Sequence, residues 1–175
     1  MVSLSIDSIN GKAPYRVLCR EDRPFNFYFR TDFSIDFNIS IKPDYSIILS
    51  GAYTLDITNA VCKSSPNDPK FRKTLIAIIE EFFDKNNDVM LYVTETGDDK
   101  QMSRNRLFVR WFNTYEGNEK FFIHTAEGKM EGQLNFMALF SRKDNPNLPH
   151  AVEEFDETVS FLFDHPVIGG DTYIL

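Results

Sequence analysis

The chain has 175 residues, of which 42% are hydrophobic and 26% are charged. It is therefore long enough to bury a core and too apolar for an intrinsically disordered protein. Its formal net charge of −7 excludes binding of nucleic acid through overall positive charge, although a local basic face stays open.

Two further features favour a cytoplasmic protein without a membrane partner. The first seven residues lack the basic start and apolar run of a signal peptide, and the longest aliphatic run, Leu75–Ile79, is too short to span a bilayer. Cys19 and Cys62 form neither a CxxC pair nor a metal-ligand spacing. We therefore expect free thiols in a reducing compartment.

The N-terminal third predicts β-structure. Apolar residues alternate with polar ones over residues 25–29 and again over residues 35–41, which is typical of strands with one buried face. The two runs are close enough in sequence to form an antiparallel hairpin. Residues 15–19 predict another short strand. Residues 45–50 and 52–58 predict two more, interrupted by a glycine at a turn or bulge.

The middle of the chain predicts helix, strand, turn and helix. Asp68 followed by Pro69 is a strong helix start, and we expect a helix with one apolar side and one solvated side. The apolar side contains Phe71, Leu75, Ile78, Ile79, Phe82 and Phe83. The solvated side contains Lys70, Lys73, Thr74, Glu80, Glu81 and Asp84, with an i,i+4 pair between Glu81 and Lys85.

A buried central strand is expected next, from the apolar run Val89–Val93. It is followed by a turn at Gly97-Asp98-Asp99 and a helix over Gln101–Tyr115, which Gly117 ends. Trp111 lies on the apolar stripe of that helix, so we expect it in the core rather than as a stacking platform.

The C-terminal part predicts strands over Lys120–Thr125 and Leu134–Ser141, a turn at residues 144–147 and a last helix over His150–Phe163. No repeat or linker divides the chain. We therefore predict a single α+β domain over residues 1–175, with a predominantly antiparallel sheet and about three helices packed on it. Residues 1–14 and 166–175 are expected to be irregular.

Candidate functional residues concentrate between residues 96 and 113. Asp98 and Asp99 follow a buried strand, where acids can bind a metal, but Asp-rich turns and helix starts explain them better. Arg104 lies on an apolar stripe, so we expect it either to pair with one of these acids or to open into a pocket. Arg106 and Arg110 are one helical turn apart and could bind phosphate or an acidic partner, or form a solvated face.

Other chemistry has little support in the sequence. His124, His150 and His165 are widely spaced, and neither a GxSxG motif nor a glycine-rich phosphate loop is present. We therefore predict no catalytic residue, no metal and no cofactor.

Three segments carry a resemblance to a known family. They are Ser65–Lys70 with the helix after it, Thr96–Gln101 leading into Arg104–Phe108 and Trp111–Asn113, and Asp144–Pro149. Over roughly residues 25–163 the chain resembles an uncharacterised family of small Bacteroidetes proteins. The resemblance implies a bacterial, cytoplasmic, single-domain protein and carries no activity, cofactor or catalytic residue with it.

These observations lead us to expect a non-enzymatic binding or interaction module. Its surface would comprise Asp98, Asp99, Arg104, Arg106 and Arg110, and its partner would be a protein or an anionic ligand. One alternative is a metal- or nucleotide-dependent enzyme that uses Asp98, Asp99 and Arg104. A second alternative is a nucleic-acid-binding module, which the negative net charge disfavours. The exposed edge of the N-terminal hairpin could also pair with a second copy of the chain.

Overall fold

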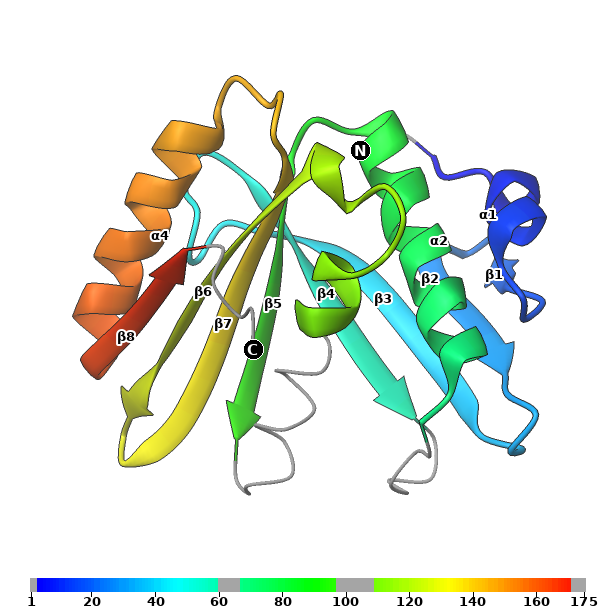
Figure 1. The fold of residues 1–175 in the computed structure, drawn as a ribbon, viewed down its shortest axis with the longest axis horizontal. Coiled ribbons are helices and arrows are strands. Elements are labelled where there is room, and N and C mark those ends of the chain that lie inside the picture. The colour runs from blue at the N-terminus through cyan, green and yellow to red at the C-terminus, as the bar shows by residue number, and fades with distance from the viewer. Residues whose placement is uncertain (1–2, 60–66, 97–108, 171–175) are drawn as a thin grey trace. The chain divides into compact units, whose positions relative to one another are not determined.

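A computed structural model (Figure 1) describes residues 3–59, 67–96 and 109–170. The described backbone consists of mostly antiparallel strands with helices, which confirms the predicted α+β class. The chain divides into two compact units. Unit 1 contains Met1–Lys42 and Leu55–Asn87, and unit 2 contains Pro43–Thr54 and Asp88–Leu175. The single domain stays a prediction.

Unit 1 is a small antiparallel sheet with two helices. β2 pairs antiparallel with β1 and β3, and Phe27 lies opposite Ile39 while Phe29 lies opposite Phe37. This pairing confirms the predicted hairpin. Its elements are α1 (Ile6–Lys12), β1 (Leu18–Arg20), β2 (Arg23–Arg30), β3 (Asp36–Asp44, ending in unit 2), β4 (Ala52–Asn59, beginning in unit 2) and α2 (Pro69–Lys85).

The start of α2 follows the sequence prediction. The side chain of Asp68 accepts hydrogen bonds from the backbone N–H groups of Lys70 (3.0 Å) and Phe71 (3.2 Å), and proline occupies the first turn. Such a cap satisfies amides that have no partner within the helix. The ring of Phe71 then packs on those of Phe37 and Phe29, with centroids 4.4 and 5.7 Å away. The cap and these rings fix α2 on the hairpin.

Two predictions about unit 1 are wrong. Residues 6–12 form helix α1, capped by Ser5, where the sequence predicts irregular structure. Thr74 and Glu81 are buried on α2 rather than solvated, and Glu81 does not pair with Lys85. The carboxylate of Glu81 instead accepts hydrogen bonds from the N–H of Ser5 (2.9 Å) and the hydroxyl of Ser8 (2.5 Å). The physical reason is that α1 binds to this side of α2.

Unit 2 is a second sheet region in which the start of β4, β5, β7, β6 and β8 neighbour one another in that order. β4 and β5 are parallel, whereas β5–β7, β7–β6 and β6–β8 are antiparallel. The elements are β5 (Val89–Thr96), a helical segment over residues 109–113, η1 (Asn118–Lys120), β6 (Phe121–Met130), β7 (Gln133–Arg142), α4 (Leu148–Leu162) and β8 (Asp164–Gly170).

Both faces of the unit 2 sheet are covered. Leu91 and Leu139 belong to one buried cluster with Phe155 of α4. On the opposite face, Phe140 lies across from Met90 and contacts the ring of Phe112 in the helical segment, at a centroid distance of 5.1 Å. Successive strand residues point to opposite faces. The run of apolar residues at the start of β5 is therefore buried on both faces of the sheet, by α4 on one face and by the helical segment on the other. This confirms the predicted central strand.

The C-terminal part differs from prediction in its extents. β6 and β7 are joined by a two-residue turn at Glu131 and Gly132, both with positive φ (53° and 79°), so the hairpin is longer than the sequence predicts. Residues 164–170 form strand β8 on β6 instead of an irregular tail. α4 begins at Leu148 rather than at His150. No helix in the described residues is both long and apolar enough to cross a membrane.

Candidate functional site

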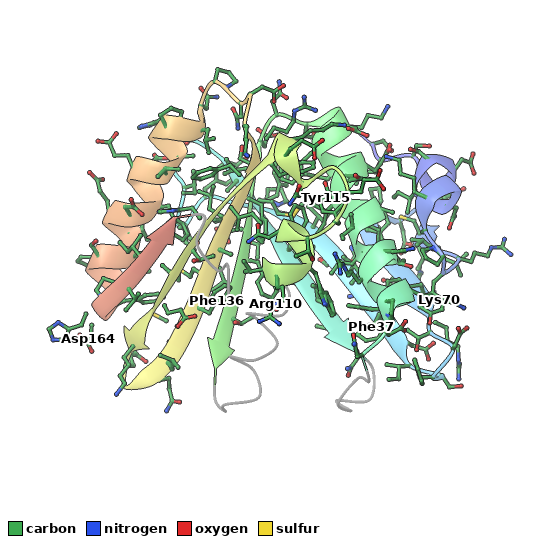
Figure 2. The ribbon with its side chains drawn as sticks, viewed as in Figure 1. Phe37, Lys70, Arg110, Tyr115, Phe136 and Asp164 are labelled. Atoms are coloured by element: carbon green, nitrogen blue, oxygen red, sulfur yellow. The ribbon has the colours of Figure 1, made fainter. Side chains whose placement is uncertain are left out.

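Only one of the predicted site residues can be placed in the structure. The other four, Asp98, Asp99, Arg104 and Arg106, lie outside the described residues. The expected pairing of Arg104 with an acid and the expected binding surface therefore stay predictions. Arg110 is described. It lies within the helical segment 109–113 and is exposed (Figure 2).

The backbone that carries Arg110 is anchored on both sides of this residue. Val109 and Phe112 are 2% and 1% exposed, and the ring of Phe112 packs on those of Phe121 and Phe140 at centroid distances of 5.6 and 5.1 Å. The carbonyl of Arg110 accepts a hydrogen bond from the hydroxyl of Thr114 (2.8 Å). The apolar side chains hold the segment on the sheet of unit 2, and Arg110 is directed to solvent.

The guanidinium of Arg110 has the chemistry of an anion-binding group and is exposed. Its guanidinium carries five N–H donors in a planar fork that matches a carboxylate or a phosphate. Within the described part of the chain, no acid forms an ion pair with this group. Its place in the last turn of the helical segment also favours a cation there, because the C-terminal end of a helix is negative. Trp111, the next residue, is half-buried rather than fully within the core.

A pair of titratable groups that the sequence does not predict joins β6 to α4. Nε2 of His124 lies 2.7 Å from a carboxylate oxygen of Asp156, and His124 is 7% exposed. The imidazole is edge-on to Phe155 and stacked with Phe122, at centroid distances of 5.5 and 6.0 Å. The two partners are 32 residues apart in no recognisable spacing, so no sequence signal identifies the pair.

The chemical capacity of the His124–Asp156 pair is limited by what surrounds it. Such a pair is the base-orienting half of a nucleophilic triad, which also needs a hydroxyl or thiol at the other ring nitrogen. Nδ1 of His124 is buried, and no hydroxyl or thiol of the described residues is hydrogen-bonded to it. The contact that the structure does show ties α4 to β6.

In unit 1 a further set of buried polar groups surrounds the start of α2. The hydroxyl of Tyr15 donates a hydrogen bond to Asp68 (2.9 Å) and accepts one from the N–H of Asp32 (3.2 Å). Burial raises the pKa of the Tyr15 hydroxyl; the Asp32 N–H opposes this rise and Asp68 adds to it. Lys70 pairs with Asp32 at 2.7 Å on the exposed side. These contacts brace the helix cap.

The described residues contain no group of three or more His, Cys, Asp or Glu side chains that could hold a metal ion. The other two histidines, His150 and His165, are exposed. Cys19 is a free thiol, as expected, and Cys62 lies outside the described residues.

The described residues form an α+β fold with a mostly antiparallel sheet, and the exposed Arg110 lies on a helical segment packed against the strands of unit 2. The chain belongs to a family of unknown function, DUF6169, whose model matches residues 67–157, just over half of the chain. The match runs from the start of α2 into α4. No curated protein and no solved structure matches the chain. The predicted resemblance to an uncharacterised family is thus confirmed, and no relative indicates a specific function.

Proposed function

We propose that the protein is a non-enzymatic binding module that recognises an anionic group of a partner through the arginine-bearing surface of residues 96–113. The observation that supports this proposal is the placement of Arg110, exposed on a segment that Val109 and Phe112 hold in the core. A cation on a fixed backbone loses less conformational freedom on binding than one on a flexible loop. The proposal extends the surface to Asp98, Asp99, Arg104 and Arg106.

The overall charge of the chain shapes the kind of recognition proposed. A net charge of −7 repels a polyanion at long range, so the attraction has to come from short, directional hydrogen bonds. Arginine supplies these bidentately to a carboxylate or phosphate, whereas lysine acts as a point charge. The proposed partner is therefore a protein with an exposed acidic or phosphorylated side chain rather than a nucleic acid.

The test compares Arg110→Ala and Arg110→Lys with Lys143→Ala, a matched control that removes one exposed charge elsewhere in unit 2. The probes are poly-glutamate, a phosphoserine peptide and inorganic phosphate, titrated against the full chain labelled at its arginine side chains for NMR. We expect one of these probes to shift the Arg110 signal, with about tenfold weaker binding for Arg110→Ala. Arg110→Lys should be intermediate, and Lys143→Ala should match the unaltered chain.

The proposal is wrong if Arg110→Ala and Lys143→Ala bind all three probes equally well. Combining Arg110→Ala with Arg106→Ala should weaken binding further without changing the melting temperature. Thermal stabilisation by Mg²⁺ with a nucleotide, abolished by Asp98→Asn, would favour the enzyme alternative instead. The cytoplasmic location, the Bacteroidetes origin and pairing with a second copy stay predictions.

A further inference from the structure

A second surface of unit 2 combines exposed apolar side chains with negative charge. Of the large apolar residues in this unit, Tyr45, Leu49 and Phe161 are 63%, 75% and 87% exposed. Soluble proteins expose single apolar residues routinely, so exposure alone decides nothing. These three residues lie close to one another, however, because Phe161 belongs to α4 and Tyr45 and Leu49 belong to the segment 45–50 that lies beside α4.

Three hydrogen bonds hold residues 45–50 along one side of α4, and one of them joins the N–H of Ser50 to the carboxylate of Glu154 (3.3 Å). The hydroxyl of Ser50 donates to the carboxylate of Glu154 (2.6 Å), and the hydroxyl of Thr158 donates to the carbonyl of Ile47 (3.1 Å). Glu154, Thr158 and Phe161 are spaced i, i+4 and i+7, so they share one side of the helix. Phe161 therefore continues the side of α4 that faces residues 45–50. We call Tyr45, Leu49 and Phe161, with this side of the helix, the α4 flank.

The α4 flank is strongly acidic. Residues 43–54 and 148–162 contain five acids and no lysine or arginine. Glu157 is exposed and lies one turn before Phe161, and the side chain of Glu153 is 72% exposed. Two of the acids lie near His150, at 3.7 Å for Glu154 and 3.9 Å for Glu153, whereas Asp156 pairs with His124 of β6. Apolar side chains here are thus rimmed by carboxylates.

We propose that the α4 flank is the docking surface for a basic amphipathic segment of a partner protein, with its apolar side on Leu49 and Phe161 and its cations on the acidic rim. Charge complementarity identifies this occupant. A second copy of the chain docked symmetrically through the same flank would place the exposed acids Glu153 and Glu157 near the same acids of the other copy, which like-charge repulsion disfavours. A segment with lysine or arginine around apolar residues matches both parts of the surface. This inference does not depend on the function proposed for Arg110.

The experiment uses the full chain and two synthetic peptides of about 15 residues, long enough to form a helix on binding. Both have leucine at helical spacing, and their polar positions are lysine in one and glutamate in the other. Binding is measured by fluorescence anisotropy at low and high salt. We expect the Leu/Lys peptide to bind, the Leu/Glu peptide not to bind, and high salt to weaken the complex.

Matched variants separate a docking surface from general stickiness. Phe161→Ser and Leu49→Ser should each weaken Leu/Lys peptide binding about fivefold or more. Val167→Ser, which changes an apolar residue of β8 that is 65% exposed, should not. Likewise Glu157→Gln should weaken binding, whereas Glu119→Gln, an exposed acid of η1, should not. All five side chains are exposed, so thermal melts should show unchanged folding.

Three outcomes would overturn the proposal. One is equal binding of the Leu/Lys peptide by Phe161→Ser and Val167→Ser, and another is equal binding of the two peptides by the unaltered chain. The third is a dimer in sedimentation velocity that Phe161→Ser dissociates, because a second copy would then be the occupant.

Discussion

The contact between α1 and α2 offers the sharpest test of how unit 1 is held together. Glu81 is 2% exposed, and its two carboxylate oxygens accept hydrogen bonds from the N–H of Ser5 and the hydroxyl of Ser8. Ser8→Ala removes the second bond and leaves one oxygen of a buried carboxylate without its donor. A buried acceptor without a donor lowers the free energy of unfolding by more than the net contribution of the lost hydrogen bond, because the acceptor has also lost its contact with water.

The magnitude follows from the charge of the acceptor. Hydrogen bonds to charged groups contribute about 1.5–3 kcal/mol, which for a chain of this size corresponds to a fall of about 3–12 °C in melting temperature. Ser8 lies within α1, so replacing it by alanine also gains up to about 0.7 kcal/mol of helix propensity. Ser160→Ala in α4 is the matched control, because Ser160 is exposed in a helix and gains the propensity term alone.

The assay is urea unfolding followed by circular dichroism, together with hydrogen exchange of the α1 amides. Because α1 has only seven residues and cannot be stable alone, Ser8→Ala should speed exchange in α1 more than in α2. The reasoning is refuted if Ser8→Ala and Ser160→Ala unfold within about 0.5 kcal/mol of each other and α1 exchange is unchanged.

Two further predictions concern packing and pH. A Cβ atom added at Gly128 would lie 2.5 Å from Cβ of Phe163, so Gly128→Ala should lower the free energy of unfolding by about 1–3 kcal/mol. Gly11→Ala in α1 is the control, because a Cβ atom there would have no heavy atom within 4 Å and should not lower this free energy. Thermal melts of the two variants test the prediction. Burial first, and then Asp68, raise the pKa of the Tyr15 hydroxyl in the folded state. The contribution of Tyr15 to the free energy of unfolding is therefore present below pH 10 and is lost as the pH rises through the folded pKa. Tyr15→Phe should make the alkaline loss of stability shallower in urea unfolding at increasing pH, and an unchanged slope would contradict this.

The predictions that succeeded rest on signals within a few residues of one another. The start of α2 is determined by Asp68 and Pro69, whose effects are local. The hairpin of β2 and β3 is determined by alternating rings such as Phe27 and Phe29, because a strand with one buried face needs that pattern wherever it lies. Signals of this kind do not depend on what the rest of the chain does.

The predictions that failed depend on distant parts of the chain. The helical pattern of α2 predicts that Glu81 is solvated. Glu81 is instead buried, because Ser5 and Ser8 at the start of α1, more than 70 residues away in sequence, donate hydrogen bonds to it. β8 contains Pro166 and two glycines, which predict irregular structure, yet β6 supplies the partner strand that orders it. The same holds for the candidate sites, because nothing in the sequence brings His124 to Asp156.

The two surfaces of unit 2 lie on opposite faces of its sheet, since α4 packs on the face of Leu139 and the helical segment with Arg110 packs on the face of Phe140. Adjacent residues of one strand therefore support an acidic, apolar flank on one side and an exposed cation on the other. Because a layer of strands separates Arg110 from Phe161, a partner on either face leaves the other accessible, and substitutions at the two positions should act independently.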